Sequence, residues 1–137
     1  TGGVAAITFR HVDGHSIGSW TGLGSPDLPI PTDYYAAEEV AEIAGERGII
    51  WINQTSAKLL GAPPVSLYRD GKVRHFTEME TDWGDSFRTG GMEFTNAIVN
   101  GGPIDITAGD ARHVLAFLLA AKMSALEHRE VAISELD

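Results

Sequence analysis

The sequence predicts an α+β domain with an open, mainly antiparallel β-sheet and helices packed on one face of the sheet. In the first two thirds of the 137 residues, β-prone runs are separated by Asp-Gly and Gly-x-x-Gly turn signals. The last third has helical spacing of apolar residues with recognisable helix ends. The length fits one domain, residues 1–137, and the 43% hydrophobic and 21% charged content is typical of a globular protein.

The first elements expected are two strands and a loop. The segment VAAITFRHVDGHSIGSW has β-prone runs on both sides of Asp13-Gly14, which predicts a hairpin. Residues 21–33 contain two glycines and three prolines, which predict a long loop. Because long loops often carry function, this one is a candidate site wall or partner contact.

Two further hairpins are expected. Residues 36–42 are rich in alanine and glutamate, which favours helix locally, but Gly45 and Gly48 indicate a turn before an apolar run. We therefore expect residues 40–44 to pair with residues 49–53. An Asp-Gly pair between Val65–Arg69 and Lys72–Phe76 predicts the next hairpin more strongly.

A helix is expected after Thr81, where Phe87, Phe94 and Ile98 fit one side of a helix that ends at Gly101-Gly102-Pro103. Two adjacent glycines in its middle each cost about 1 kcal/mol relative to alanine. Two short turns are therefore the alternative.

The last helix has a clear start, because Thr107 and Asp110 form a capping-box pattern ahead of regularly spaced apolar residues. His128 and Arg129 suit its C-terminal end, where the helix dipole favours positive charge. Residues 131–136 alternate in polarity and predict a closing strand.

Residues 49–52, Ile-Ile-Trp-Ile, are apolar on both sides of a strand. Two helices cover one face of the sheet, so the other face needs a partner. Self-association through this open face is the simplest expectation. The alternative is that long loops fold over it.

Composition excludes several classes of function. The formal net charge of −9 disfavours binding to nucleic acid or acidic membranes. The absence of cysteine removes disulfides, thiolate nucleophiles and cysteine-ligated metals, and fits a cytoplasmic protein. No glycine-rich nucleotide motif is present, and no apolar run is long enough to span a membrane.

Polar residues that suit a site occur in two places. His11 and His15 flank the Asp13-Gly14 turn; together with Asp13 they form only a weak metal-ligand pattern, and solvated strand ends are the better interpretation. We expect no metal site.

The second place is HFTEMETDWGDSFRTGG. Its carboxylates suit the first turn of a helix better than acid–base catalysis. Trp83 offers a flat face to a sugar or ring, and Arg88 offers a fork to a carboxylate or phosphate.

Several stretches resemble the C-terminal domain of the glucose–fructose oxidoreductase (Gfo/Idh/MocA) family. VAEIAGERGIIWIN is similar to its strand–Gly-x-x-Gly–strand hairpin, and TGGVAAITFRHVDGHSIGSW to its first strand pair. VSLYRDGKVRHF and FTNAIVNGGPIDITAGDARHVLAFLLAAKMSALEHREVAI are similar to the rest. The most specific features are the helix that ends in NGGP, the Thr-x-x-Asp-Ala-Arg helix start, and Ala-Ala-x-x-Ser-Ala ahead of a final strand.

The resemblance implies a dihydrodipicolinate-reductase-like fold for this chain. It also implies a parent protein in which a Rossmann domain that binds NAD or NADP comes first and is absent from this chain. The family oxidises or reduces a hydroxyl or carbonyl carbon on a sugar, cyclitol or related compound. Its second domain covers the substrate and forms homo-oligomers through the open sheet face.

The same resemblance implies that no catalytic or cofactor-binding residue lies in this chain. The family's Glu-Lys-Pro lysine has no counterpart among Lys58, Lys72 and Lys122. We therefore expect the isolated chain to be inactive and to bind no cofactor. The expected substrate contacts are Trp83, Asp85, Arg88, His11 and Trp20, together with the loop of residues 21–33.

Two alternative functions are compatible with the sequence. One is a free-standing, non-enzymatic module of the same fold that binds a small molecule or assembles subunits. The other, much weaker, is a small metal-dependent enzyme that uses His11, His15 and nearby carboxylates.

Overall fold

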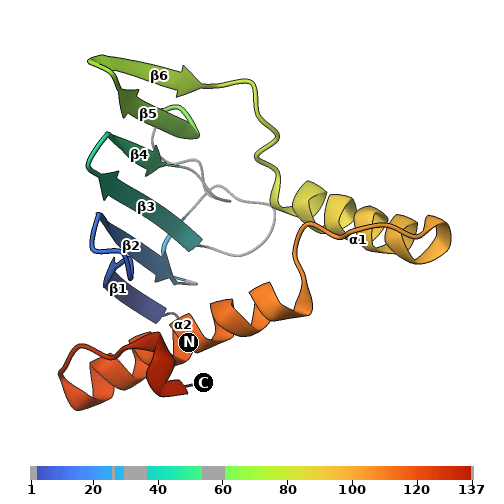
Figure 1. Ribbon diagram of the computed structural model, residues 1–137. Helices are drawn as coiled ribbons and strands as arrows, with labels where there is room; N and C mark the ends of the chain where they lie inside the picture. The colour runs from blue at the N-terminus through green and yellow to red at the C-terminus, as the bar shows by residue number, and fades with distance from the viewer. Residues whose placement is uncertain (1–2, 26, 30–36, 54–60, 137) are drawn as a thin grey trace. The chain divides into compact units, whose positions relative to one another are not determined.

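The computed structural model describes residues 3–25, 27–29, 37–53 and 61–136. The chain is α+β, with an open six-stranded antiparallel sheet followed by two helices (Figure 1). It divides into two compact units, Thr1–Arg88 and Thr89–Asp137, which are considered one at a time below.

The sheet is a meander in which each strand pairs with the next one along the chain, in the order β1-β2-β3-β4-β5-β6 (Figure 1). Its strands are β1 Gly3–Arg10, β2 Ser16–Gly24, β3 Ala37–Gly45, β4 Gly48–Ile52, β5 Val65–Arg69 and β6 Lys72–Phe76. All three hairpins expected from the sequence are confirmed.

Local sequence explains the tight turns. Asp70 and Gly71, the two residues between β5 and β6, have φ of 52° and 73°, the left-handed conformation that Asp-Gly favours in two-residue hairpins. Gly14 has φ of 72° in the longer turn between β1 and β2. Strand β3 begins at Ala37, earlier than expected, because it pairs with β2 along its whole length. Pairing with β2 along the whole strand, and with β4 from Ala41 onward, thus overrides the helix propensity of its alanines and glutamates.

The prediction of a loop over residues 21–33 is wrong for residues 21–24. Thr21–Gly24 continue β2 and pair with both β1 and β3, so these glycines lie inside a strand. After the strand, the amide of Asp27 donates to Ser25 Oγ at 3.3 Å. Residues 26 and 30–33 lie outside the described residues.

The register divides the sheet into two faces, because directly paired residues project to the same side. One row across all six strands is almost entirely apolar: Ile7, Trp20, Ala41, Ile52, Val65 and Phe76. We call the side with this row the apolar face. The next row, on the opposite side, contains Thr8, Ser19, Glu42, Trp51, Ser66 and His75, and we call that side the mixed face.

Strand β4 is apolar on both faces, as expected. Ile50 and Ile52 belong to the apolar face, and Ile49 and Trp51 belong to the mixed face. On the mixed face the Trp51 indole N–H donates to Glu42 Oε2 at 2.5 Å.

Helix α1, Trp83–Asn100, is continuous through its glycine pair, so the alternative of two short turns is wrong. It ends at Gly101, whose φ of 66° is the left-handed conformation common just after helix ends. Helix α2, Ala108–Glu127, has the expected capping box between Thr107 and Asp110. No helix in the described part of the chain is long and apolar enough to cross a membrane.

The prediction of a closing strand over residues 131–136 is wrong. Ile133–Leu136 forms a short 3₁₀ helix, η1. Arg129 Nη2 pairs with Glu135 Oε2 at 2.8 Å, while the Ala132 amide donates to Glu135 Oε1 at 2.9 Å. These local bonds satisfy the backbone within a turn and compete with an extended strand.

Candidate functional site

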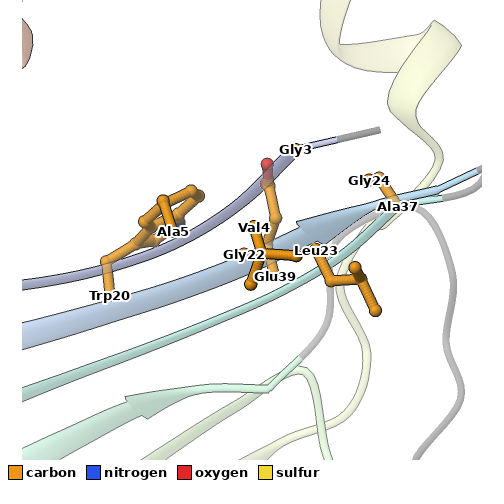
Figure 2. Close-up of a pocket in the computed structure, with 9 residues that line it drawn as sticks. All are labelled: Gly3, Val4, Ala5, Trp20, Gly22, Leu23, Gly24, Ala37 and Glu39. Atoms are coloured by element: carbon orange, nitrogen blue, oxygen red, sulfur yellow. The ribbon is translucent and has the colours of Figure 1, made fainter. Parts of the chain in front are cut away.

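A shallow depression of about 290 Å³ lies at one end of strands β1, β2 and β3 (Figure 2). This volume is at the small end of the range for small-molecule sites, about 300–1,000 Å³, and suits a single ring. Its lining residues are Gly3, Val4, Ala5, Trp20, Gly22, Leu23, Gly24, Ala37 and Glu39.

Trp20 supplies the largest apolar surface of the depression. A side chain at Gly22 would begin 2.4 Å from the Trp20 Cη2 atom, so the six-membered ring of the indole occupies the space above that glycine. Residues 20 and 22 are two apart on one strand and share a face. Gly22 therefore allows the indole to lie along β2 beside the depression.

Glu39 supplies a carboxylate to the same depression (Figure 2). It pairs directly with Gly22 and so shares the face of Trp20. Its neighbour Glu38 points to the opposite face, where Oε2 is shielded and has no hydrogen-bond partner among the described residues. Burial, and then repulsion from Glu39, raise the pKa of Glu38.

The depression has the chemistry of a site for a neutral hydroxylated ring. An indole packs against the C–H face of such a ring, and a carboxylate accepts hydrogen bonds from its hydroxyl groups. The Glu39 carboxylate disfavours an anionic ligand in the depression.

The three expected contacts Trp83, Asp85 and Arg88 lie together at the start of α1. The rings of Trp83 and Phe87 meet edge to face with centroids 4.8 Å apart. Arg88 Nε donates to Asp85 Oδ1 at 2.9 Å, and Nη2 donates to the same oxygen. These hydrogen bonds to Asp85 raise the pKa of Arg88. The guanidinium fork already binds a carboxylate within its own helix, which leaves less of it for a ligand.

The two histidines of the first hairpin have different partners. His11 Nδ1 lies 3.0 Å from Asp13 Oδ2, and His15 Nδ1 lies 2.7 Å from Glu46 Oε1 in the β3–β4 turn. A backbone hydrogen bond from His15 lowers the pKa of Asp13. Within the described ranges, no three histidine or carboxylate side chains are grouped closely enough to bind a metal ion. His11 and Trp20 were both expected as substrate contacts, but the structure does not bring them together. His11 lies at the turn of the first hairpin, whereas Trp20 lines the depression.

One serine–histidine pair lies on the mixed face. Ser66 Oγ is 3.0 Å from His75 Nδ1. A serine and a histidine at this distance are two of the three members of a catalytic triad, the third being a carboxylate that orients the histidine. However, Ser66 is buried, and the carboxylate in the same row, Glu42, binds Trp51. We assign this pair to cross-strand stabilisation of the sheet.

Among the residues that line the depression, Trp20 and three members of the segment 21–33 were expected as contacts from the sequence: Gly22, Leu23 and Gly24. These three lie in a strand and not in the expected loop, and Glu39 was missed because it has no distinguishing motif. The spacing Trp-x-Gly within a strand was the available signal, since it places a ring above a missing side chain.

The fold and the depression define an α+β domain with an open antiparallel sheet and a small pocket on its apolar face. No family model, curated protein or solved structure matches the chain.

Proposed function

We propose that the chain is the C-terminal substrate-binding and oligomerisation domain of an NAD(P)-dependent oxidoreductase. The substrate is a sugar, a cyclitol or a related hydroxy or carbonyl compound. The observation that carries the proposal is the six-stranded antiparallel meander followed by two helices, which is the element order of the domain that the sequence resembles as far as the end of α2. The parent enzyme is a cytoplasmic homo-oligomer whose Rossmann domain holds the cofactor.

The depression beside Trp20 supports the substrate class. It combines an aromatic surface with the Glu39 carboxylate and is sized for one ring. Because the Glu39 carboxylate lies in the depression, the substrate is a neutral polyol or sugar and not a sugar acid or phosphate.

The two apolar sides of strand β4 support the oligomerisation role. One face of the sheet packs within the parent subunit, and the other pairs with a second subunit. The mixed face is the better candidate for the subunit contact, since Trp51 offers an aromatic anchor among hydrogen-bonding residues.

The test is to isolate the natural gene product with an antibody to this chain and measure its mass and its redox activity. We expect a band at two to three times the 14.7 kDa of this chain, consistent with a second domain of ordinary size. We also expect oxidation of NADH or NADPH, or reduction of NAD or NADP, with a member of a panel of neutral sugars and cyclitols.

A product of 14.7 kDa that binds neutral sugars without touching the nicotinamide would support the free-standing binding module instead. Micromolar binding of NADH by the isolated chain would contradict the assignment of the cofactor site to another domain.

A further inference from the structure

The two edge strands of the sheet differ in how they are protected. Strand β6 carries Lys72 and Arg74, and charged residues on an edge strand oppose pairing with another chain. Strand β1 has no charged residue from Gly3 to Phe9. Of the two edges that the described sheet presents, β1 is therefore the one without this protection.

Strand β1 is also well exposed. It pairs with β2 on one side only, and Val4 is 81% exposed. The outer backbone groups of an edge strand form a ready template for a further strand. An eight-residue strand is long enough to provide several such hydrogen bonds.

We propose that β1 pairs in antiparallel fashion with β1 of a second copy of this chain and joins the two sheets into one. The two-fold axis is perpendicular to the sheet, so both apolar faces lie on the same side of the joined sheet. This contact uses the strand edge, and it is distinct from the face-to-face contact in the proposed function.

Charge favours this edge over the rest of the surface as the place where a second copy binds. The chain carries a net charge of −9, so two copies repel each other over most of their surfaces. Strands β1 and β2 contain no carboxylate, and the nearest strand glutamates are on β3. At two strand spacings they lie about 10 Å from the edge, a distance comparable to the screening length in physiological salt.

The register follows from the uncharged stretch. Its central residue is Ala6, and a two-fold axis there pairs the most residues without a charge. Val4 then faces Thr8 of the second copy, and Gly3 faces Phe9 of the second copy. Phe9 already covers a glycine within its own sheet, since a side chain at Gly18 would begin 2.2 Å from the Phe9 ring.

The pairing also completes the depression beside Trp20, a consequence that rests on the proposed function. Gly3, Val4 and Ala5 of the edge strand form one side of the depression. In this register Ile7 of the second copy lies opposite Ala5 on the same face. The second copy thus supplies an apolar wall, and ligand affinity depends on dimer formation.

Charge reversal across the two-fold axis tests the pairing. The double variant Val4→Lys, Thr8→Lys places like charges opposite each other twice, and we expect the molar mass measured by sedimentation to fall by about half. The double variant Val4→Lys, Thr8→Glu places opposite charges there instead and is expected to restore the wild-type mass. Val12→Lys is the matched control, because Val12 is 96% exposed in the turn between β1 and β2, outside both proposed contacts, and it leaves the mass unchanged.

Cross-linking gives a second measurement that does not depend on the stability of the lysine variants. The chain has no cysteine, so a single Ala6→Cys substitution reports on one position. Mild oxidation is expected to give a disulfide-linked dimer with Ala6→Cys and no linked dimer with Val12→Cys, in the turn outside both proposed contacts. Equal linking at both positions, an unchanged mass in the lysine pair, or a folded monomeric wild type at high micromolar concentration would overturn the edge pairing.

Binding of the neutral sugar panel separates the two proposals. Because Val4 itself lines the depression, the double variant Val4→Lys, Thr8→Glu, which keeps this lysine and restores the wild-type mass, is the binding control. If the lysine pair becomes smaller and loses sugar binding at least tenfold relative to this control, the completed pocket is supported. If it becomes smaller and binds as before, the wall from the second copy is wrong. If no sugar binds to the wild type or to the lysine pair, the proposed substrate class is wrong. The edge pairing is then judged from the cross-linking result alone.

Discussion

At the residue scale, the pocket depends on the absence of a side chain at position 22. Trp20 occupies the space that any larger residue would need, and a strand that is paired on both sides fixes the two residues on one face. Glycine normally weakens a strand, and its presence at position 22 is explained by the Trp20 ring, which occupies the space of a side chain.

Gly22→Ala is expected to alter the pocket more than the fold. The clash is with the far end of a rotatable side chain, so the indole swings away while the strand stays paired. Titration of the domain with the neutral sugar that binds best, followed by tryptophan fluorescence, should show weaker binding. Gly90→Ala is the matched control, because nothing lies within 4 Å of the added atom; it should leave binding unchanged.

Glu39→Gln extends the same test to the hydrogen-bonding side of the pocket. A hydrogen bond to a charged group contributes about 1.5 kcal/mol or more, so the affinity should fall about tenfold or more. Glu42→Gln, on the same strand but the mixed face, is the control. Equal losses in both glutamine variants would show that the ligand does not bind at the depression.

At the element scale, α2 depends on its first turn. The Thr107 amide donates to Asp110 Oδ2 at 2.8 Å, and the Asp110 amide donates to Thr107 Oγ1 at 3.2 Å. The side-chain hydrogen bond from Thr107, followed by its backbone hydrogen bond, lowers the pKa of Asp110 below 3.8. The ionised carboxylate also suits the positive end of the helix dipole.

The sign of the pH effect follows from this lowered pKa. Asp110 stabilises the folded state above pH 3.8, and this contribution is lost as the pH falls through the lower pKa of the folded protein. In urea unfolding followed by circular dichroism, Asp110→Asn should be less stable than wild type at neutral pH and converge with it in acid. Thr107→Ala should cost about 1 kcal/mol at neutral pH. A gap between wild type and Asp110→Asn that persists unchanged in acid would contradict the role of the ionised carboxylate.

Most helices, strands and turns were predictable from local sequence signals. The Asp-Gly turns, the Gly-x-x-Gly hairpin and the capping box are local signals, and each gave the correct element. Residues 131–136 were misassigned because their alternation resembles a strand, whereas the ion pair between Arg129 and Glu135 decides the conformation. Residues 21–24 were misassigned because glycine was read as a loop signal without knowledge of the strands on either side.

The candidate site was predictable only in part, for a related reason. Trp20 has a distinctive side chain, so it was identified from the sequence. Glu39 is one of several similar glutamates, and only the register of β2 with β3 places it beside Trp20. The face of a strand residue depends on pairing between segments, which a single sequence does not display.

At the scale of the whole molecule, we propose two separate contacts between the sheet and further copies. The edge contact uses β1, and the face contact uses the side that carries Trp51. Two different two-fold contacts on one subunit generate a closed tetramer of dihedral symmetry when their axes are perpendicular. A long uncharged edge and an aromatic residue on an open face are thus explained by one assembly.

Trp51→Glu tests the face contact independently of the edge. The new carboxylate faces Glu42 across the strand pair and removes the aromatic anchor, so sedimentation should show loss of the face contact only. Combined with the lysine pair at residues 4 and 8, it should leave a monomer, whereas each change alone leaves a dimer. Trp51→Phe, which keeps the ring, should retain the wild-type mass. If Trp51→Glu folds and keeps that mass, the mixed face is not a subunit contact, and the assembly relies on the edge strand or on another surface.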